Sequence, residues 1–135
     1  MRIIVVVFCV ALIASACADP TAPAAPAPVV PTVTDTFTGT LTALATNSHP
    51  FVVSAVGGVT VTLTSVVPPV KLAIGIGTPS TTTGTCVVIN SKVTDAGPTP
   101  QLSGTGTVPG KFCVAVSDPG NVTETAAYTI TVLHS

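Results

Sequence analysis

Threonine at every second position is the feature of this sequence that most constrains its fold. The first such run is Val33–Leu41, in which every even-numbered residue is threonine and the odd-numbered residues include Phe37 and Leu41. Successive side chains of a β-strand point to opposite faces, so this spacing predicts a strand with hydroxyl groups on one face and apolar groups on the other. The alternation recurs at 59–64 and 128–133, which indicates a domain built from half-buried strands.

The composition supports an all-β fold and narrows the classes of partner. Charged residues make up 7% of the chain, against about 25% in ordinary soluble domains. Valine and threonine, which suit a pleated sheet, are abundant, whereas helix-favouring residues are scarce. The net charge is −1 and the few lysines form no stripe, so nucleic acid and an anionic membrane surface are excluded as electrostatic partners.

Further apolar runs, separated by turn signals, extend the pattern to about seven or eight strands. They lie at 51–56, 72–76, 86–93 and 112–117, with at most a short strand near 105–108. Gly57-Gly58 predicts a tight hairpin turn, and 118–121 predicts another turn. We therefore expect residues 33–135 to form an antiparallel, jelly-roll-like β-sandwich. The expected core residues are Phe37, Phe51, Leu63, Ile74, Phe112, Val114, Tyr128 and Ile130.

The N-terminus has the order of a secretory signal peptide. Met1-Arg2 supplies a positive charge, Ile3–Ile13 is apolar, and Ala14-Ser15-Ala16 is a run of small residues. The apolar stretch is shorter than the approximately 20 residues that a membrane-spanning helix needs. Residues 1–16 are therefore predicted to be cleaved from an exported protein.

Cys17 follows the small residues directly, and Ala14–Cys17 resembles the lipobox of bacterial lipoproteins. The resemblance implies that the cysteine thiol receives a diacylglyceryl group and anchors the mature chain to a membrane. The alternative is ordinary cleavage after Ala16, which would leave Cys17 as an unpaired thiol. Because Ala18 rather than aspartate follows the cysteine, the resemblance favours the outer membrane of the cell envelope over the inner one.

Residues 17–32 read as a lipidated cysteine followed by a spacer. The stretch 19–31 is rich in proline and alanine, and proline excludes it from helix interiors and central strands. As an extended polyproline II chain it would reach roughly 40 Å. We interpret it as a tether between the membrane anchor and the β-domain.

Cysteine usage predicts one disulfide. Cys9 is removed with the signal peptide and Cys17 carries the lipid, which leaves Cys86 and Cys113 in an oxidising compartment. Both lie in predicted strands, so a bond between them would link two rigid elements. The alternative is a pair of separate buried thiols.

The last third of the chain carries a family resemblance. The segment 110–116 (GKFCVAV) resembles the Gly-x-aromatic-x-Val-x-Val strand of bacterial pre-peptidase C-terminal domains, 127–132 resembles their closing strand, and 51–63 resembles their opening hairpin. The resemblance implies a non-catalytic, jelly-roll-like module of the kind attached to secreted peptidases. Val70-Lys71-Leu72 departs from the family, whose members often have an aspartate before the middle strand, so binding roles are not carried over.

The sequence contains few groups for catalysis or cofactor binding. His49 and His134 are both expected at the surface, and no Gly-x-Ser-x-Gly motif is present. A Ser-His-Asp triad would have to be assembled in space. Asp118, Asn121 and Glu124 share one predicted loop and form a candidate calcium site, although an Asp-Pro-Gly-Asn turn explains the same residues. No cofactor is expected.

The predicted function is that of a non-catalytic, lipid-anchored envelope protein whose β-sandwich binds or assembles with another molecule. An envelope protein or a polysaccharide is the expected partner, besides the membrane itself. The rival hypotheses are an accessory domain of a secreted hydrolase or peptidase system, a hydrolase with a cryptic triad, and a structural envelope protein without a ligand.

Overall fold

The computed structural model describes residues 29–135, and within that range the chain forms eight strands and no helix. Residues 29–32 are exposed and precede the first strand, which begins at Val33. No helix in the described range is long and apolar enough to cross a membrane. The strands are β1 (Val33–Leu41), β2 (Thr46–Val53), β3 (Gly57–Val67), β4 (Leu72–Pro79), β5 (Cys86–Thr94), β6 (Leu102–Gly106), β7 (Gly110–Ser117) and β8 (Ala126–His134).

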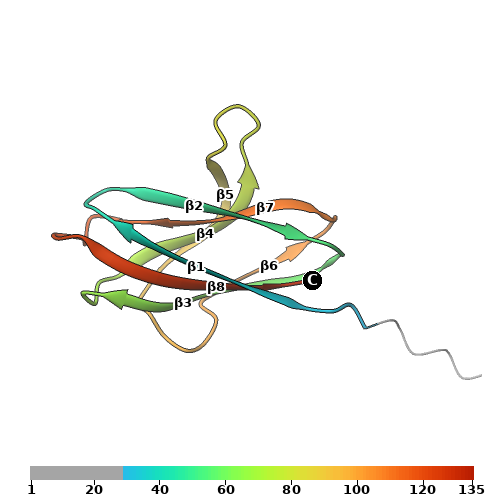
Figure 1. Cartoon of the computed structure of the whole chain (residues 1–135), viewed down its shortest axis with the longest axis horizontal. Coiled ribbons are helices and arrows are strands. Elements are labelled where there is room, and N and C mark those ends of the chain that lie inside the picture. Colours follow the sequence, from blue (N-terminus) through green and yellow to red (C-terminus); the bar gives the residue numbers. More distant parts are fainter. Residues whose placement is uncertain (1–28) are drawn as a thin grey trace, which may run out of the picture.

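The strands form two four-stranded antiparallel sheets that pack face to face, which confirms the predicted β-sandwich (Figure 1). One sheet has the order β1-β8-β3-β6 and the other the order β2-β7-β4-β5. The chain passes from one sheet to the other at every connection except β4–β5. This is the strand order of a jelly roll. In each strand, one set of alternate residues therefore faces the interior between the sheets, and the other set faces solvent.

The core lies between the sheets and follows the alternation seen in the sequence. In β1 the threonines are exposed and the odd-numbered residues turn inward, ending at the fully buried Leu41. In β8 the buried residues are Ala126, Tyr128, Ile130, Val132 and His134. Six of the eight expected core residues are buried. Phe37 and Phe112 are only half-buried and pack against the edge of the core.

The predicted Gly57-Gly58 hairpin turn is wrong. Gly57 and Gly58 are the first residues of β3 and pair with Gly106 and Thr105 of β6. The preceding turn carries the chain from one sheet to the other, so β2 and β3 are not paired with each other. Gly57 is needed for space instead of conformation, because a Cβ atom there would collide with the Ser135 hydroxyl group.

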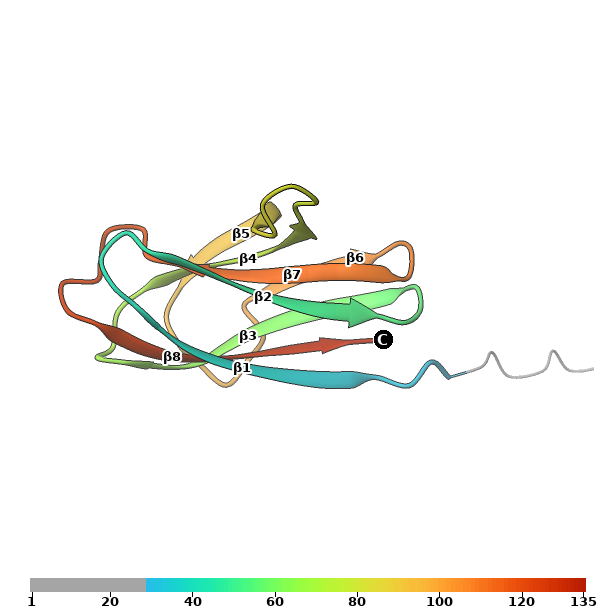
Figure 2. The same cartoon turned by 45° about the horizontal axis from the view of Figure 1, so that its top comes forward.

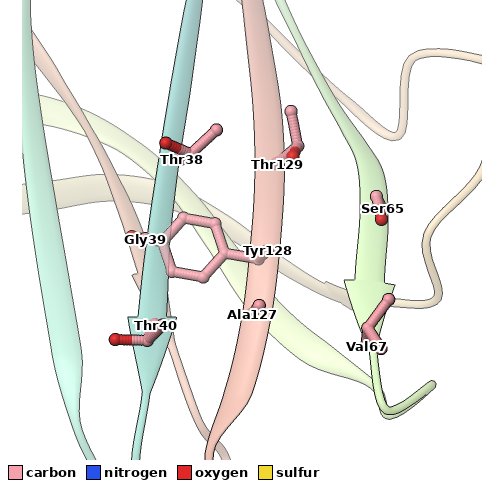
Figure 3. Close-up of a pocket in the computed structure, with 8 residues that line it drawn as sticks. All are labelled: Thr38, Gly39, Thr40, Ser65, Val67, Ala127, Tyr128 and Thr129. Atoms are coloured by element: carbon pink, nitrogen blue, oxygen red, sulfur yellow. The ribbon is translucent and has the colours of Figure 1, made fainter.

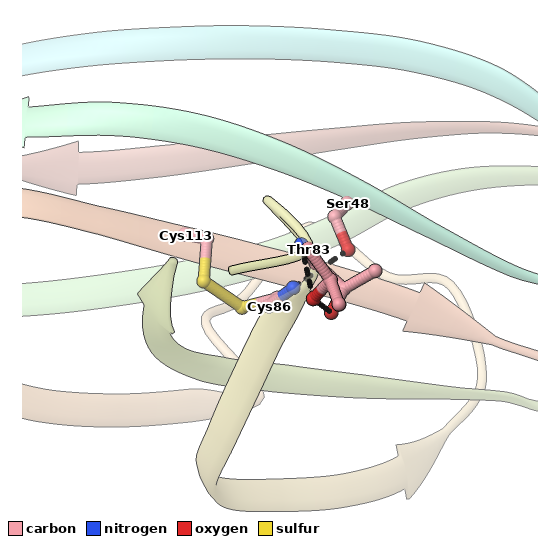
Figure 4. Close-up of a disulfide and its surroundings, with 5 residues drawn as sticks. Ser48, Thr83, Cys86 and Cys113 are labelled. Atoms are coloured by element: carbon pink, nitrogen blue, oxygen red, sulfur yellow. Dashed lines mark hydrogen bonds between the residues drawn. A yellow bond between two sulfur atoms is a disulfide. The ribbon is translucent and has the colours of Figure 1, made fainter. Parts of the chain in front are cut away.

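Strand β5 is an exposed edge strand, and the predicted disulfide fastens it to the sheet. Cys86 at its start is bonded to Cys113 of β7, with the Cα atoms 5.7 Å apart (Figure 4). Because β4 lies between β5 and β7 in the sheet, the bond spans a strand. In the register of the sheet, Cys113 pairs with Gly77 of β4 and Cys86 pairs with Pro79. A Cβ atom at Gly77 would overlap the Val87 carbonyl group. A bulge at Ile76/Gly77 lets β5 approach β7 at this point.

The two ends of the sandwich differ in what they present. The start of β1 and the C-terminus lie at one end, whereas the β1–β2, β3–β4 and β7–β8 connections lie at the other (Figure 2). The pairing agrees with this arrangement, because Val33 pairs with His134 while Leu41 pairs with Ala126. We call the second end the distal end, because it lies farthest from the point where the chain enters the domain.

Candidate binding site

A pocket of about 350 Å³ opens on the outer face of the sheet β1-β8-β3, toward the distal end. We call it the threonine groove, and Figure 3 shows its residues on the three strands. β8 runs along its middle, with β1 on one side and β3 on the other. Its lining residues are Thr38, Gly39, Thr40, Ser65, Val67, Ala127, Tyr128 and Thr129.

The groove arises from small side chains flanked by larger ones. In the register of the sheet, Ala127 lies between Thr40 of β1 and Val67 of β3. Its methyl group fills less space than either neighbour, so the surface is hollowed at this point. Two residues farther along β8, Thr129 lies between Thr38 of β1 and Ser65 of β3. The three side chains form a row of hydroxyl groups across the same three strands. The groove therefore has a hydroxyl-rich side and an apolar end.

The hydroxyl rows continue beyond the groove over the outer face of this sheet. Thr131 lies between Thr36 and Thr62, and Leu133 lies between Thr34 and Thr60. Strands β3 and β8 contain no Asp, Glu, Lys or Arg, and the only such residue in β1 is Asp35. Asp35 is directed to His134, with 3.1 Å between its Oδ2 atom and Nε2. The outer face of these strands is thus uncharged. Its accessible hydroxyl groups are regularly spaced on β1 and β8, whereas on β3 a bulge separates Ser65 from Leu63 and Thr62 is buried.

Beneath the groove, Tyr128 connects the two sheets. Its hydroxyl group accepts a hydrogen bond from Asn47 Nδ2 at 3.0 Å and lies 2.7 Å from His49 Nε2, both on β2. The His49 ring also stacks on Phe37, with ring centroids 4.9 Å apart. These contacts position the tyrosine, which is 2% exposed, and connect β8 to β2 beneath the groove.

Burial changes the proton affinities within this network. Desolvation raises the pKa of Tyr128 and outweighs the hydrogen bond from Asn47, which acts in the opposite direction. Desolvation lowers the pKa of His49, so the neutral imidazole is favoured. Because Asn47 donates to the phenol oxygen, the phenol proton is available for donation to Nε2 of the neutral imidazole. The network is satisfied without any net charge.

The expected surface position of His134 is wrong, and that of His49 is only partly right. His134 is 3% exposed and packs 5.1 Å from the Phe51 ring, centroid to centroid. Its Nε2 atom faces Asp35, and its Nδ1 atom lies 3.3 Å from the backbone carbonyl oxygen of Ser135. The Ser135 hydroxyl group donates to the Ala55 carbonyl oxygen instead. This His-Asp pair is therefore not aligned with a serine nucleophile.

Asp118 organises the β7–β8 connection. Its Oδ1 atom accepts hydrogen bonds from the amides of Gly120, Asn121 and Val122, and its Oδ2 atom accepts one from Leu44. Desolvation raises the pKa of Asp118, but these four bonds outweigh that effect and lower it. Both carboxylate oxygens thus hold backbone amides. Leu44 has a φ of 60°, so the carboxylate also holds the β1–β2 turn in a left-handed conformation.

The three calcium candidates lie in this connection, where two of them make other contacts. Asn121 Nδ2 donates to the Lys71 carbonyl oxygen at 3.0 Å, and Glu124 is exposed. Among residues 29–135, no group of three or more His, Cys, Asp or Glu is placed to hold a metal ion. The calcium site at Asp118, Asn121 and Glu124 stays a prediction. Cys17, the signal peptide and the tether up to residue 28 lie outside the described residues.

The sequence interpretation missed the threonine groove and the buried His134. The inward period of β8, which continues from Tyr128 through Ile130 and Val132 to position 134, was a signal for the histidine. The groove depends on Ala127 lying between two particular strands. That pairing joins segments far apart in the sequence, so no local pattern indicated it.

Comparisons with known proteins leave the family open. No family model matches the chain, and no curated protein sequence matches it. Among solved structures, the chain is similar to the crystal structure of Aeromonas hydrophila PliG, a periplasmic lysozyme inhibitor of g-type lysozyme. The TM-score is 0.49 and the sequence identity 18%, and the match covers 73% of this chain and 83% of the other.

Proposed function

We propose that this chain is a non-catalytic binding module of the cell envelope, anchored by a lipid on Cys17, that presents the threonine groove away from the membrane. The observation that carries the proposal is the position of the groove relative to the chain entrance. The tether would join the domain at Val33, whereas the groove begins at Thr38 and lies toward the distal end. Strands rise about 3.3 Å per residue, so roughly 17 Å separates Val33 from the start of the groove at Thr38.

Two further observations support export and binding over catalysis. The disulfide between Cys86 and Cys113 is of the kind that persists in oxidising compartments. The two histidines are engaged with Tyr128 and with Asp35, in contacts that tie strands together. The jelly-roll strand order is compatible with a pre-peptidase C-terminal-like module, which we retain as part of the proposal.

The proposal is tested by capture of envelope material with a blocked groove as the comparison. An affinity tag is placed in the tether, because Ser135 is buried and its backbone accepts a hydrogen bond from Ser54. Ala127→Glu fills the groove, and Thr105→Glu adds the same side chain at an exposed position on β6 of the same sheet. We expect the wild type and Thr105→Glu to retain the same component and Ala127→Glu to lose it.

The anchor and the rival hypotheses need separate controls. Cys17→Ser should move the protein from the detergent phase to the aqueous phase and leave groove-dependent capture intact. Intact-mass measurement of an unmodified Cys17 in the wild type would contradict the anchor. Hydrolase activity that His49→Ala abolishes would contradict the non-catalytic proposal, as would capture that is identical for Ala127→Glu and the wild type.

A further inference from the structure

We infer that the threonine groove binds an uncharged glycan chain, with the hydroxyl rows of the outer face of β1-β8-β3 as the continuation of the site. This inference rests on the proposed binding function and names the chemical class of its ligand. Three properties of the face support it: its lack of charge, the spacing of its hydroxyl groups, and the apolar residues at its two ends.

The lack of charge restricts the ligand first. A solvated sheet face in an ordinary domain carries charged side chains, because they make up about a quarter of such sequences. Here the strands that form the groove present Thr, Ser, Ala, Val and Leu outward. Phosphorylated or carboxylated ligands would find no cation on these strands to pair with. A neutral ligand loses no ion hydration when it binds to this surface.

The spacing of the hydroxyl groups then favours a ligand with repeating polar groups. Neighbouring strands lie about 4.8 Å apart and alternate residues about 6.7 Å apart. Along β1 and β8 the row of Thr38 and Thr129 is therefore followed by Thr36 and Thr131. On β3 the bulge between Leu63 and Ser65 interrupts this spacing, and Thr62 is buried. Sugar hydroxyl groups both donate and accept hydrogen bonds, as threonine hydroxyl groups do. A glycan chain can satisfy successive rows with successive sugar units.

Apolar side chains at the two ends of the face match the apolar C–H surfaces of sugar rings. Val67 is 63% exposed at the groove end, and Leu133 is 41% exposed beyond the second row. The C–H faces of sugar rings are apolar and can cover these side chains. A protein partner is less well matched, because binding hot spots are enriched in Trp, Tyr and Arg, and the only such residue of the groove, Tyr128, is buried.

The described face of β1-β8-β3 carries no exposed aromatic ring, and this limits the affinity for each sugar unit. Without ring stacking, each sugar unit contributes only hydrogen bonds and small apolar contacts, and a net hydrogen bond contributes about 1 kcal/mol. We therefore expect single sugars to bind too weakly to saturate. The affinity should rise with each added unit until the rows from Ser65 to Leu133 are covered.

The test titrates the folded, disulfide-bonded protein with fully N-acetylated chito-oligosaccharides and with cello-oligosaccharides of increasing length, followed by NMR amide shifts. A polyanionic glycan, alginate oligomers, serves as the charge comparison. The inference predicts shifts centred on Thr38, Ser65 and Thr129 that saturate with the longer neutral oligomers and are absent with alginate. Shifts centred on the exposed strand β5, or no shifts with any neutral oligomer, would overturn it.

Variants separate the hydroxyl groups from the shape of the groove. Thr38→Val combined with Thr129→Val keeps the branched side chains and removes two hydroxyl groups, which should weaken binding about tenfold or more. Thr105→Val is the matched control on β6, with binding within about twofold of the wild type. Unchanged affinity in the double variant would contradict the inference, provided that its thermal midpoint shows it to be folded.

The glycan inference and the proposed function can fail separately. Capture of an envelope component that Ala127→Glu abolishes, together with no binding of neutral oligomers, would reject the glycan and leave the binding module in place. Loss of both would reject both. Oligomer binding that Ala127→Glu abolishes supports the two together.

Discussion

Tyr128 lies directly opposite Gly39 in the pairing of β8 with β1, and its ring crosses the glycine to bring the hydroxyl group to β2. A Cβ atom at position 39 would lie 2.5 Å from the tyrosine hydroxyl oxygen. The glycine is therefore required by the tyrosine, and the pair joins the edge of one sheet to the other.

Gly39→Ala should destabilise the domain, because either the ring or β1 must move. We expect a loss of about 1–3 kcal/mol in the free energy of unfolding, as for other overpacked sites, measured by urea denaturation. Gly58→Ala is the control, since an added Cβ atom at position 58 meets no atom within 4 Å. Equal stability of the two variants would show that Tyr128 can leave Gly39 without cost.

Tyr128→Phe should also destabilise the domain while retaining the ring. The change removes the acceptor of Asn47 and the partner of His49, and a lost hydrogen bond of this kind costs about 1–2 kcal/mol. Asn47 keeps its bond to the Thr40 carbonyl oxygen, which limits the loss. A double-mutant cycle with Asn47→Ala measures the coupling, and purely additive effects would contradict a shared network.

His49 should make the domain less stable in mild acid. Its pKa in the folded state is lowered from 6.5 by desolvation, so the unfolded chain takes up a proton at a higher pH than the folded chain does. The contribution of neutral His49 to the free energy of unfolding is therefore fully present above pH 6.5. It is lost as the pH falls toward and through the lower folded-state pKa. Urea denaturation at several pH values should show this slope in the wild type and a reduced slope in His49→Gln. Identical slopes would assign the effect to other groups.

Much of the fold was predictable because its information is local. Alternation from Val33 to Leu41 indicated both the strand and its buried face, and the two cysteines left after export indicated the disulfide. The partners of each strand were not predictable, because pairing such as Thr40 with Ala127 depends on contacts across most of the chain. For the same reason Gly57-Gly58 was mistaken for a turn, since Gly57 makes room for the distant Ser135.

The disulfide between Cys86 and Cys113 should stabilise the domain and act mainly on β5. The cysteines are 27 residues apart, and a loop of this length corresponds to about 3–4 kcal/mol in the chain-entropy model. Cys86→Ala combined with Cys113→Ala should lower the thermal midpoint and abolish its sensitivity to reductant.

Hydrogen exchange distinguishes a local effect of this bond from a global one. Among the described strands β5 pairs only with β4, and it is exposed along most of its length, so its own packing protects it little. In the double alanine variant we expect faster exchange of the β4–β5 amides and unchanged exchange at the β1–β8 pairing. Gly77→Ala should loosen the same strand even with the disulfide formed, because the added Cβ atom displaces the Val87 carbonyl group. Uniform acceleration across both sheets would show instead that the disulfide stabilises the whole domain without a particular role at its edge.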